Sequence, residues 1–158
     1  MEIKVKNVSQ SSVVLAQIML PADTNSSGNV HGGTIMKLID NAAYVVAARH
    51  TGRNVVTASI DRLDFHYPVF LGNLVTFKAS INRAGKTSME VGVRVEAEDL
   101  MTGEVRHTAS AYLTFVALDA DGRPTPVSEL AAETVEDERR FTEAGKRYAV
   151  RKSSKKQM

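Results

Sequence analysis

The chain has 158 residues, 43% hydrophobic and 24% charged, which is ordinary for a globular protein and enough for one domain with a real core. It contains no cysteine, which excludes disulfide bonds, thiol catalysis and cysteine-ligated metal sites. The formal net charge is only +2, the N-terminus lacks the apolar stretch of a signal peptide, and no apolar run reaches the length of a membrane span. We therefore expect a cytoplasmic protein with neither a membrane nor a nucleic-acid partner.

The first half of the chain predicts a strand, a polar loop and a long helix. Residues 12–20 are predicted as a strand, and residues 22–33 form a loop rich in serine, asparagine and glycine. The helix is predicted from about Thr34 to Arg49, because His50 and Gly52 are typical signals of a helix C-terminus.

Four further segments alternate apolar and polar side chains with the period of two that a half-buried strand requires. These predicted strands are residues 54–63, 74–83, 87–98 and 104–118. Short glycine-containing breaks separate the last three from one another and from the first, and predict hairpin connections at 71–73, 84–86 and 101–103. Successive strands with short turns predict an antiparallel meander. Its apolar face is expected to consist of Val75, Phe77, Ala79 and Ile81, then Met89, Val91, Val93, Val95 and Ala97, then Val105, His107, Ala109, Ala111, Leu113 and Phe115.

The C-terminal region is charged and is predicted to lie outside the main fold. Residues 1–127 are expected to form one domain, and residues 128–158 a surface helix with a basic tail. Ser128 is the predicted N-cap of a helix over 128–145, and solvated disorder is predicted for the tail that follows. A lone long apolar helix beside one antiparallel sheet must be covered by it, so the sequence predicts an α+β fold in which a curved sheet wraps the helix.

The segment 28–43 places a glycine-rich loop directly before the long helix. From 35 to 48 that helix has so few polar side chains that it is predicted to be buried. A carboxylate on a buried helix, here Asp40, must be paired, protonated or functional. The structural alternative is a contact with Lys37 or Tyr44, both at helical spacing. Because a helix start also stabilises negative charge, the segment indicates acyl transfer or hydrolysis.

Several motifs resemble one known family. They are Gly28–Gly33, Met36–Asp40, Ala47–His50, Ser59–Pro68 and Arg83–Val91. Together they resemble the acyl-CoA thioesterases of the hot-dog fold, and among these the brain-type acyl-CoA hydrolase and its single-domain bacterial relatives. The resemblance covers roughly residues 10–118.

The resemblance implies a hot-dog fold whose dimers join two sheets edge to edge, with active sites at the interface and often a trimer of dimers, hence a homohexamer. It implies Asn29 in the loop and Asp40 on the helix as the catalytic pair, contributed by opposite units. Asp40 would activate water or attack the thioester directly. The reaction would release a fatty acid and coenzyme A, placing the protein in fatty acid metabolism. Coenzyme A is part of the substrate, so no separate cofactor is expected.

Further substrate-binding residues are expected at the helix start and in one hairpin turn. His31, Gly32 and Gly33 precede or begin the helix, and the glycines either form an oxyanion hole or only let the chain turn. Arg83, Gly85, Lys86, Thr87 and Ser88 either form a plain turn or contact coenzyme A, with Lys86 or Arg83 neutralising a phosphate.

Two other functions are weaker alternatives. A hot-dog hydratase or dehydratase would need a histidine paired with an acid, and His66 lies on a strand end instead. A non-catalytic acyl-CoA-binding regulator would use the basic tail on DNA, but no helix-turn-helix precedes the predicted fold. His50, His66 and His107 are expected to be structural, and since no two histidines have metal-ligand spacing, no metal is expected.

Overall fold

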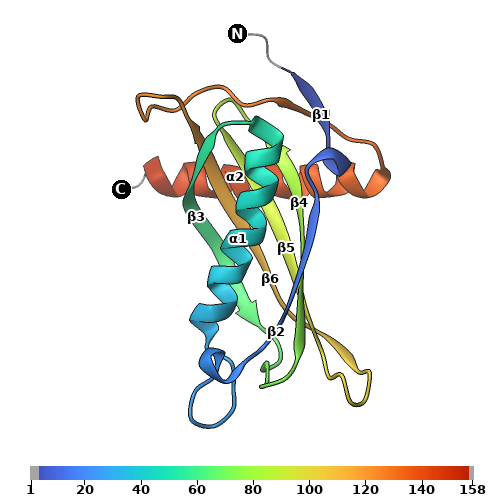
Figure 1. Cartoon of the computed structure of the whole chain (residues 1–158). Helices are drawn as coiled ribbons and strands as arrows, with labels where there is room; N and C mark the ends of the chain where they lie inside the picture. The colour runs from blue at the N-terminus through green and yellow to red at the C-terminus, as the bar shows by residue number, and fades with distance from the viewer. Residues whose placement is uncertain (1–3, 157–158) are drawn as a thin grey trace.

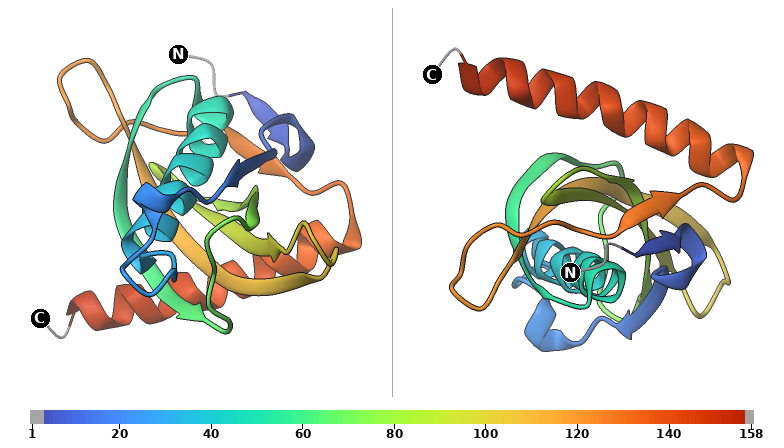
Figure 2. Two further views of the ribbon diagram at one scale, coloured as in Figure 1. Left: turned by 60° about the horizontal axis from the view of Figure 1, so that its bottom comes forward. Right: turned by 90° about the horizontal axis from the view of Figure 1, so that it is seen from above.

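The computed structural model describes residues 4–156 and has the predicted α+β architecture (Figure 1). A long helix packs on one face of a curved five-stranded antiparallel sheet, and a second helix crosses the other face (Figure 2). The elements in chain order are β1 (Val5–Asn7), η1 (Val8–Gln10), β2 (Val13–Ile18), η2 (Pro21–Asp23), α1 (Gly32–Thr51), β3 (Asn54–Phe65), β4 (Leu74–Ala84), β5 (Ser88–Glu98), β6 (Val105–Leu118), β7 (Glu129–Ala131) and α2 (Val135–Lys156).

The sheet order is β2-β4-β5-β6-β3, so the predicted meander is right for β4, β5 and β6 and wrong for β3. The break at 71–73 is not a hairpin, because β3 pairs with β6 at the far edge while β2 pairs with β4. Residues 66–73 instead cross beneath the start of α1. There the Val30 N–H donates to the Val69 carbonyl at 2.8 Å, and the Leu71 N–H donates to the Gly28 carbonyl at 3.1 Å. This crossing holds the glycine-rich loop in place.

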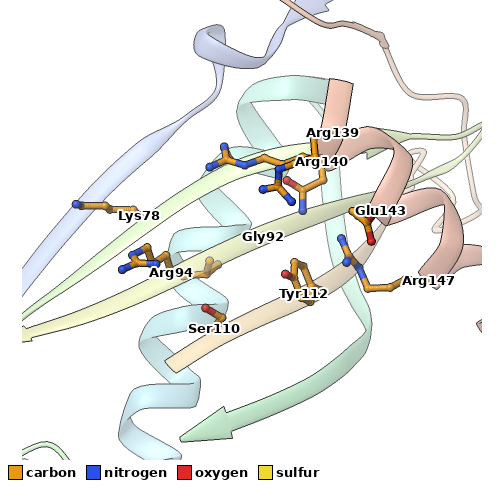
Figure 3. A pocket seen from close by; sticks show the side chains of 12 residues that line it. Lys78, Gly92, Arg94, Ser110, Tyr112, Arg139, Arg140, Glu143 and Arg147 are labelled. Carbon is orange, nitrogen blue, oxygen red and sulfur yellow. The ribbon is translucent and has the colours of Figure 1, made fainter. Parts of the chain in front are cut away.

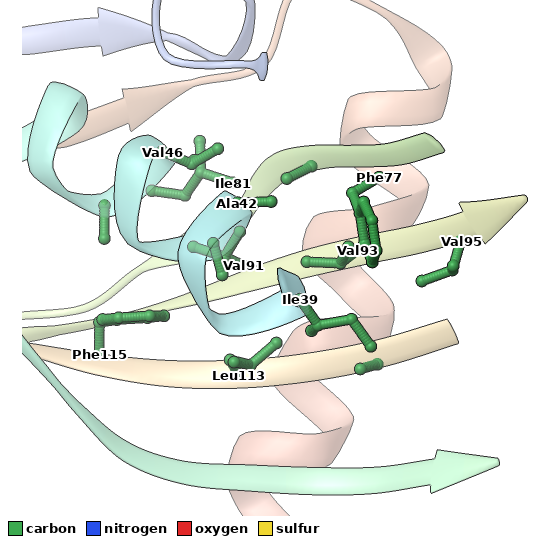
Figure 4. Close-up of a cluster of buried hydrophobic side chains, with 14 of the residues drawn as sticks. Ile39, Ala42, Val46, Phe77, Ile81, Val91, Val93, Val95, Leu113 and Phe115 are labelled. Atoms are coloured by element: carbon green, nitrogen blue, oxygen red, sulfur yellow. The ribbon is translucent and has the colours of Figure 1, made fainter. Parts of the chain in front are cut away.

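Helix α1 supplies one side of the core and the sheet supplies the other. Ile39 and Val46 pack among Phe77, Val91 and Leu113 (Figure 4), and all five are at most 1% exposed. The helix ends as predicted, at Gly52, whose φ of 63° is left-handed and whose N–H donates to the Ala48 carbonyl at 2.7 Å. The predicted apolar faces of the strands are buried, with two exceptions: His107 is half-buried and Val105 is exposed. Val105 is exposed because it lies beside a hairpin tip.

The prediction that α1 is buried all round is wrong. One flank carries Met36 and Tyr44, which are 41% and 46% exposed, and Asp40 on the same flank is half-buried. A single sheet covers only one side of a helix, so the other side of this apolar helix faces outward. Exposed large apolar side chains gathered on one helix flank indicate an interaction surface.

The C-terminal region differs most from its prediction. Residues 129–131 form β7, which pairs in parallel with β1, so Ser128 caps no helix. Helix α2 begins after Thr134, whose Oγ1 accepts the Asp137 N–H at 3.0 Å while Asp137 Oδ2 accepts the Thr134 N–H at 3.2 Å. This reciprocal pair is a capping box, which stabilises a helix start. The helix continues to Lys156, so the tail predicted as disordered is helical as far as the structure describes it.

Two cations of this tail anchor α2 to the sheet. Arg147 binds Glu90 through two nitrogens, with its Nη2 donating to Oε1 at 2.7 Å, and stacks on the Tyr112 ring at 3.6 Å. Arg151 pairs with Asp61 of β3. Glu90 lies on the face of its strand opposite the apolar one, but it is only 3% exposed because α2 covers that face.

Three of the four histidines are held in structural contacts. His50 is fully buried, and its Nε2 lies 2.8 Å from the Ser128 carbonyl oxygen. Burial lowers the pKa of His50, which favours the neutral form of its ring. His107 Nε2 lies 2.6 Å from Ser110 Oγ, and its ring meets that of His66 edge-on. These contacts agree with the interpretation of His50, His66 and His107 as structural.

Neither helix over residues 4–156 combines the length and apolarity that crossing a bilayer requires.

Candidate active site

Asp40 has a partner that the sequence did not indicate. Its Oδ1 accepts a hydrogen bond from Thr57 Oγ1 at 2.6 Å, whereas neither Lys37 nor Tyr44 bonds to it among the described residues. A β-bulge follows Thr57, since the pairing with β6 skips Ala58. Bulges re-aim side chains and are frequent next to active sites. Sequence reasoning missed Thr57 because nothing in a strand pattern shows which helical side chain a hydroxyl will face.

The loop before the helix is closed by one asparagine. Asn25 Oδ1 accepts the Ser27 N–H at 2.9 Å and the Asn29 N–H at 3.2 Å, and the Asn25 N–H donates to the Asn29 carbonyl at 2.8 Å. Gly28 between them has a φ of 83°, which a residue with a side chain rarely adopts. Asn29 is in turn bridged to Phe70 through the backbone. The loop is therefore a hydrogen-bonded turn that places Asn25 and Asn29 just before the helix.

The start of α1 presents backbone donors to its surroundings. The His31 carbonyl accepts the N–H groups of Thr34 and Ile35, at 3.0 and 3.3 Å, while within residues 4–156 no acceptor bonds to those of Gly32 or Gly33. Neither glycine has a positive φ. A Cβ on Gly33 would meet no heavy atom within 4 Å, and one on Gly32 would make only ordinary contact with Phe65 at 3.7 Å. The turn therefore does not require these two glycines, but close approach of a ligand to their N–H groups would.

A cavity of about 310 Å³ opens beside this helix start. Its walls are mostly apolar and include Val30, Gly32, Ile35, Phe65 and Val69. The volume lies at the lower end of the range of about 300–1,000 Å³ for small-molecule sites. An apolar cavity bordered by free N–H groups fits an uncharged chain that ends in a carbonyl.

A single chain does not bring all the predicted site residues together. Asp40 lies eight residues beyond Gly32, about 12 Å along the helix axis, and no hydrogen bond among the described residues joins it to Asn29. Ser88 of β5 pairs with Val116 of β6, which in turn pairs with Val56 of β3. The predicted coenzyme A turn, which ends at Ser88, therefore lies two strands, or about 10 Å, from β3.

The turn itself is a tight hairpin. The Gly85 N–H donates to the Ser88 carbonyl at 2.8 Å, and the Lys86 carbonyl accepts the Val127 N–H at 2.9 Å. Arg83 beside it stacks on the Tyr148 ring of α2 at 4.3 Å. Lys86 is exposed, whereas Gly85, Thr87 and Ser88 are half-buried. The structure thus holds Arg83 against α2 and leaves Lys86 available to a ligand.

A long helix wrapped by a curved antiparallel sheet defines the hot-dog class of proteins. A family model described as the thioesterase superfamily matches residues 27–104, which span the loop, α1 and three strands of the sheet. The chain belongs to this superfamily. It is 41% identical over 147 residues to an uncharacterized acyl-CoA thioester hydrolase, YkhA, of Bacillus subtilis, covering 93% of this chain and 86% of that protein.

Solved structures agree with this assignment. An acyl-CoA hydrolase from Staphylococcus aureus, in complex with butyryl coenzyme A and coenzyme A, superposes with a TM-score of 0.89 at 35% identity, covering 97% of this chain and 93% of that one. An apo-hexameric acyl-CoA thioesterase superposes with a TM-score of 0.92 at 37% identity, covering 96% and 97%. Structures also exist of three alanine variants of the Staphylococcus aureus protein, in which an asparagine, an aspartate and a threonine are replaced, separated by 15 and then 17 positions.

Proposed function

We propose that this chain is an acyl-CoA thioesterase, which hydrolyses an acyl-CoA to a fatty acid and coenzyme A. The observation that carries the proposal is the spacing of three polar residues. Asn25, Asp40 and Thr57 are separated by 15 and 17 positions, as are the asparagine, aspartate and threonine replaced in the Staphylococcus aureus hydrolase. In this chain two of the three are already hydrogen-bonded to each other.

The spacing favours Asn25 over Asn29 as the asparagine of the site. Both residues lie in the same turn, Asn25 seven residues and Asn29 three residues before Gly32. The Asn29 assignment came from the family pattern alone and stays a prediction. The Asn25 side chain uses its oxygen within the turn, so its amide N–H groups are the part that can face water or the thioester carbonyl.

Each part of the site has a role in thioester hydrolysis. Asp40, oriented by Thr57, either takes a proton from the attacking water or itself attacks the carbonyl carbon. In both routes the carbonyl oxygen becomes negative, and the N–H groups of Gly32 and Gly33 of the opposite chain would stabilise it. The C–S bond then breaks. In the first route the sulfur takes the proton held by Asp40; in the second it leaves as a thiolate, and water then hydrolyses the acyl–Asp40 anhydride to the fatty acid and supplies the thiol proton. Because coenzyme A is part of the substrate, this scheme includes no separate cofactor.

We propose that a second copy of this chain completes the site. β3 is a twelve-residue edge strand with one side unpaired, which invites pairing. Ile60 and Phe65 on β3 are 36% and 46% exposed, beside the exposed flank of α1 that carries Met36 and Tyr44. Pairing two β3 edges would cover this surface and give a homodimer. Hexameric structural neighbours support further assembly as a trimer of dimers.

We propose that the remaining predicted site residues contact the substrate across that interface. Arg83, Lys86 and the turn at 85–88 lie away from the Asp40 of their own chain, so they would contact coenzyme A that reaches across the interface, and His31 the substrate beside the helix start. A human relative, 37% identical over 94% of this chain and 40% of that protein, is named cytosolic. This name supports the proposed cytoplasmic location and role in fatty acid metabolism.

The function is tested by measuring free thiol release from a panel of acyl-CoAs of increasing chain length. We expect saturable hydrolysis of at least one of them, with one thiol released per fatty acid. A purified, folded protein that released no thiol from any of them would contradict the proposal. Hydration of an enoyl-CoA instead would establish the hydratase alternative.

The asparagine assignment is tested by comparing Asn25→Ala with Asn29→Ala. We expect Asn25→Ala to lower turnover by about 10²–10³-fold, the loss typical of one polar group that contacts the reacting atoms. Asn29→Ala should retain turnover within about tenfold, because the structure uses Asn29 through its backbone. The measurement is the turnover number at saturating acyl-CoA, with the melting temperature of each variant as the control for folding. The reverse order of effects would establish Asn29 as the site residue.

A further inference from the structure

A second cavity, of about 290 Å³, lies on the opposite face of the sheet from Asp40, between that face and α2. Outward-facing side chains of β4, β5 and β6 form its floor, and one side of α2 forms its roof (Figure 3). Its polar lining does not fit an acyl chain. The sheet separates this cavity from the proposed thioester site.

The floor of the cavity is shaped by one glycine and one buried amide. Asn82 is 3% exposed, and its Nδ2 donates to Glu90 Oε1 at 3.0 Å. The Asn82 side chain lies directly over Gly92 on the neighbouring strand, where a Cβ would come within 2.7 Å of Nδ2. Any residue other than glycine at position 92 would displace this amide. The floor is therefore a fixed polar surface.

The cations that line the cavity outnumber its carboxylates. Five are present, Lys78, Arg94, Arg139, Arg140 and Arg147, against one carboxylate, Glu143. Arg147 is neutralised by the buried Glu90, and Glu143 also accepts a bond from Lys146 outside the cavity.

The other four cations form two half-neutralised pairs, one on the floor of the cavity and one on its roof. On the floor, Lys78 and Arg94 share the single carboxylate of Glu96, at 3.1 and 2.9 Å. On the roof, Arg139 and Arg140 share the single carboxylate of Glu136. Neither Glu96 nor Glu136 lines the cavity. Each pair thus leaves one positive charge in excess, and Arg140 reaches across to Ser80 Oγ at 3.3 Å.

We propose that this cavity binds a phosphate-bearing anion of about the size of pyrophosphate, between Arg94 of β5 and Arg140 of α2. Arginine binds phosphate oxygens with two parallel N–H groups, and a doubly charged group between two arginines would offset both excess charges. The occupant is either the nucleotide end of coenzyme A or a free phosphorylated metabolite. The proposal of a phosphate site itself does not depend on the thioesterase activity.

The test is calorimetric titration of the full chain with inorganic pyrophosphate at low ionic strength. We expect saturable binding that weakens as salt is added, because the four cations are about half exposed and therefore screened. Arg94→Gln and Arg140→Gln should each weaken binding about tenfold or more, the usual loss for a hydrogen bond to a charged group. Arg106→Gln is the matched control, since Arg106 pairs with Glu104 near a distant hairpin tip and its loss should change binding less than twofold.

Two further arms separate this site from the proposed function and identify its occupant. Asp40→Asn should bind pyrophosphate as the wild type does, whether or not the chain hydrolyses thioesters. If coenzyme A displaces pyrophosphate and Arg94→Gln raises KM for acyl-CoA, the site holds the substrate's nucleotide. If pyrophosphate stays bound at saturating coenzyme A and ADP displaces it, the site holds a free phosphorylated ligand. Absence of saturable binding, or equal binding by wild type, Arg94→Gln and Arg140→Gln, would overturn the proposal.

Discussion

Asp40→Asn is expected to fold normally and to lose turnover by about two to four orders of magnitude, the contribution of a positioned acid or base. The amide keeps the shape of the carboxylate and can still accept the Thr57 hydroxyl. It can neither take a proton from water nor attack a thioester. The measurement is the turnover number with the best acyl-CoA of the panel. Near-normal hydrolysis by the folded variant would show that Asp40 is not a catalytic residue.

The same variant tests whether the site is shared between chains. Co-expressed Asp40→Asn and Asn25→Ala subunits should form mixed dimers that recover part of the activity, because one of the two interface sites would keep both residues. Each variant expressed alone is the control and should stay inactive. Verified mixed dimers without activity would show that both residues act from the same chain.

Arg147→Ala is expected to lower the free energy of unfolding by about 2–3 kcal/mol, near the lower end of the loss found when one partner of a buried ion pair is removed. The reason lies in the partner that remains, since the side chain of Glu90 is only 2% exposed and would keep its charge under α2 with the Asn82 amide at 3.0 Å and the more distant Arg151 at 3.8 Å beside it. Arg147 itself is 24% exposed, which moderates the loss. The measurement is urea unfolding at neutral pH.

Arg106→Ala provides the comparison for that experiment. Arg106 also pairs with a glutamate, Glu104, at 2.8 Å, but both side chains are more than half exposed. Exposed pairs contribute at most about 1 kcal/mol, so this variant should stay close to the wild type. Equal losses in the two variants would show that burial of Glu90 does not make the Arg147 contact important.

Much of the fold could be predicted because its main signals are local. Helix α1 and the long strands follow from apolar periodicity, and the left-handed Gly52 ends the helix where its residue type indicates. Asp40 was identified because a carboxylate on an apolar helix conflicts with its surroundings. The hot-dog family was recognised from motifs, and the comparisons confirm it.

The errors concern contacts between segments that are distant in the chain. The pairing of β3 with β6 depends on a crossing beneath α1, which a turn at 71–73 does not encode. The partner of Asp40 comes from a strand 17 residues away. The tail looked disordered because its charges lack neighbours in sequence, but Glu90 and Asp61 on the sheet supply them. The capping box at Thr134 was a missed local signal.

The bulge at Ala58 allows β3 to contact both helices. Residues 57 and 61 are four apart, so in a regular strand their side chains would point to the same face. The extra residue reverses this alternation, and Thr57 bonds to α1 on one side of the sheet while Asp61 pairs with Arg151 of α2 on the other. Deletion of one residue at the bulge would leave every strand of the sheet in place. One of the two helices would nevertheless lose its side-chain contact with β3, either Asp40 of α1 with Thr57 or Arg151 of α2 with Asp61.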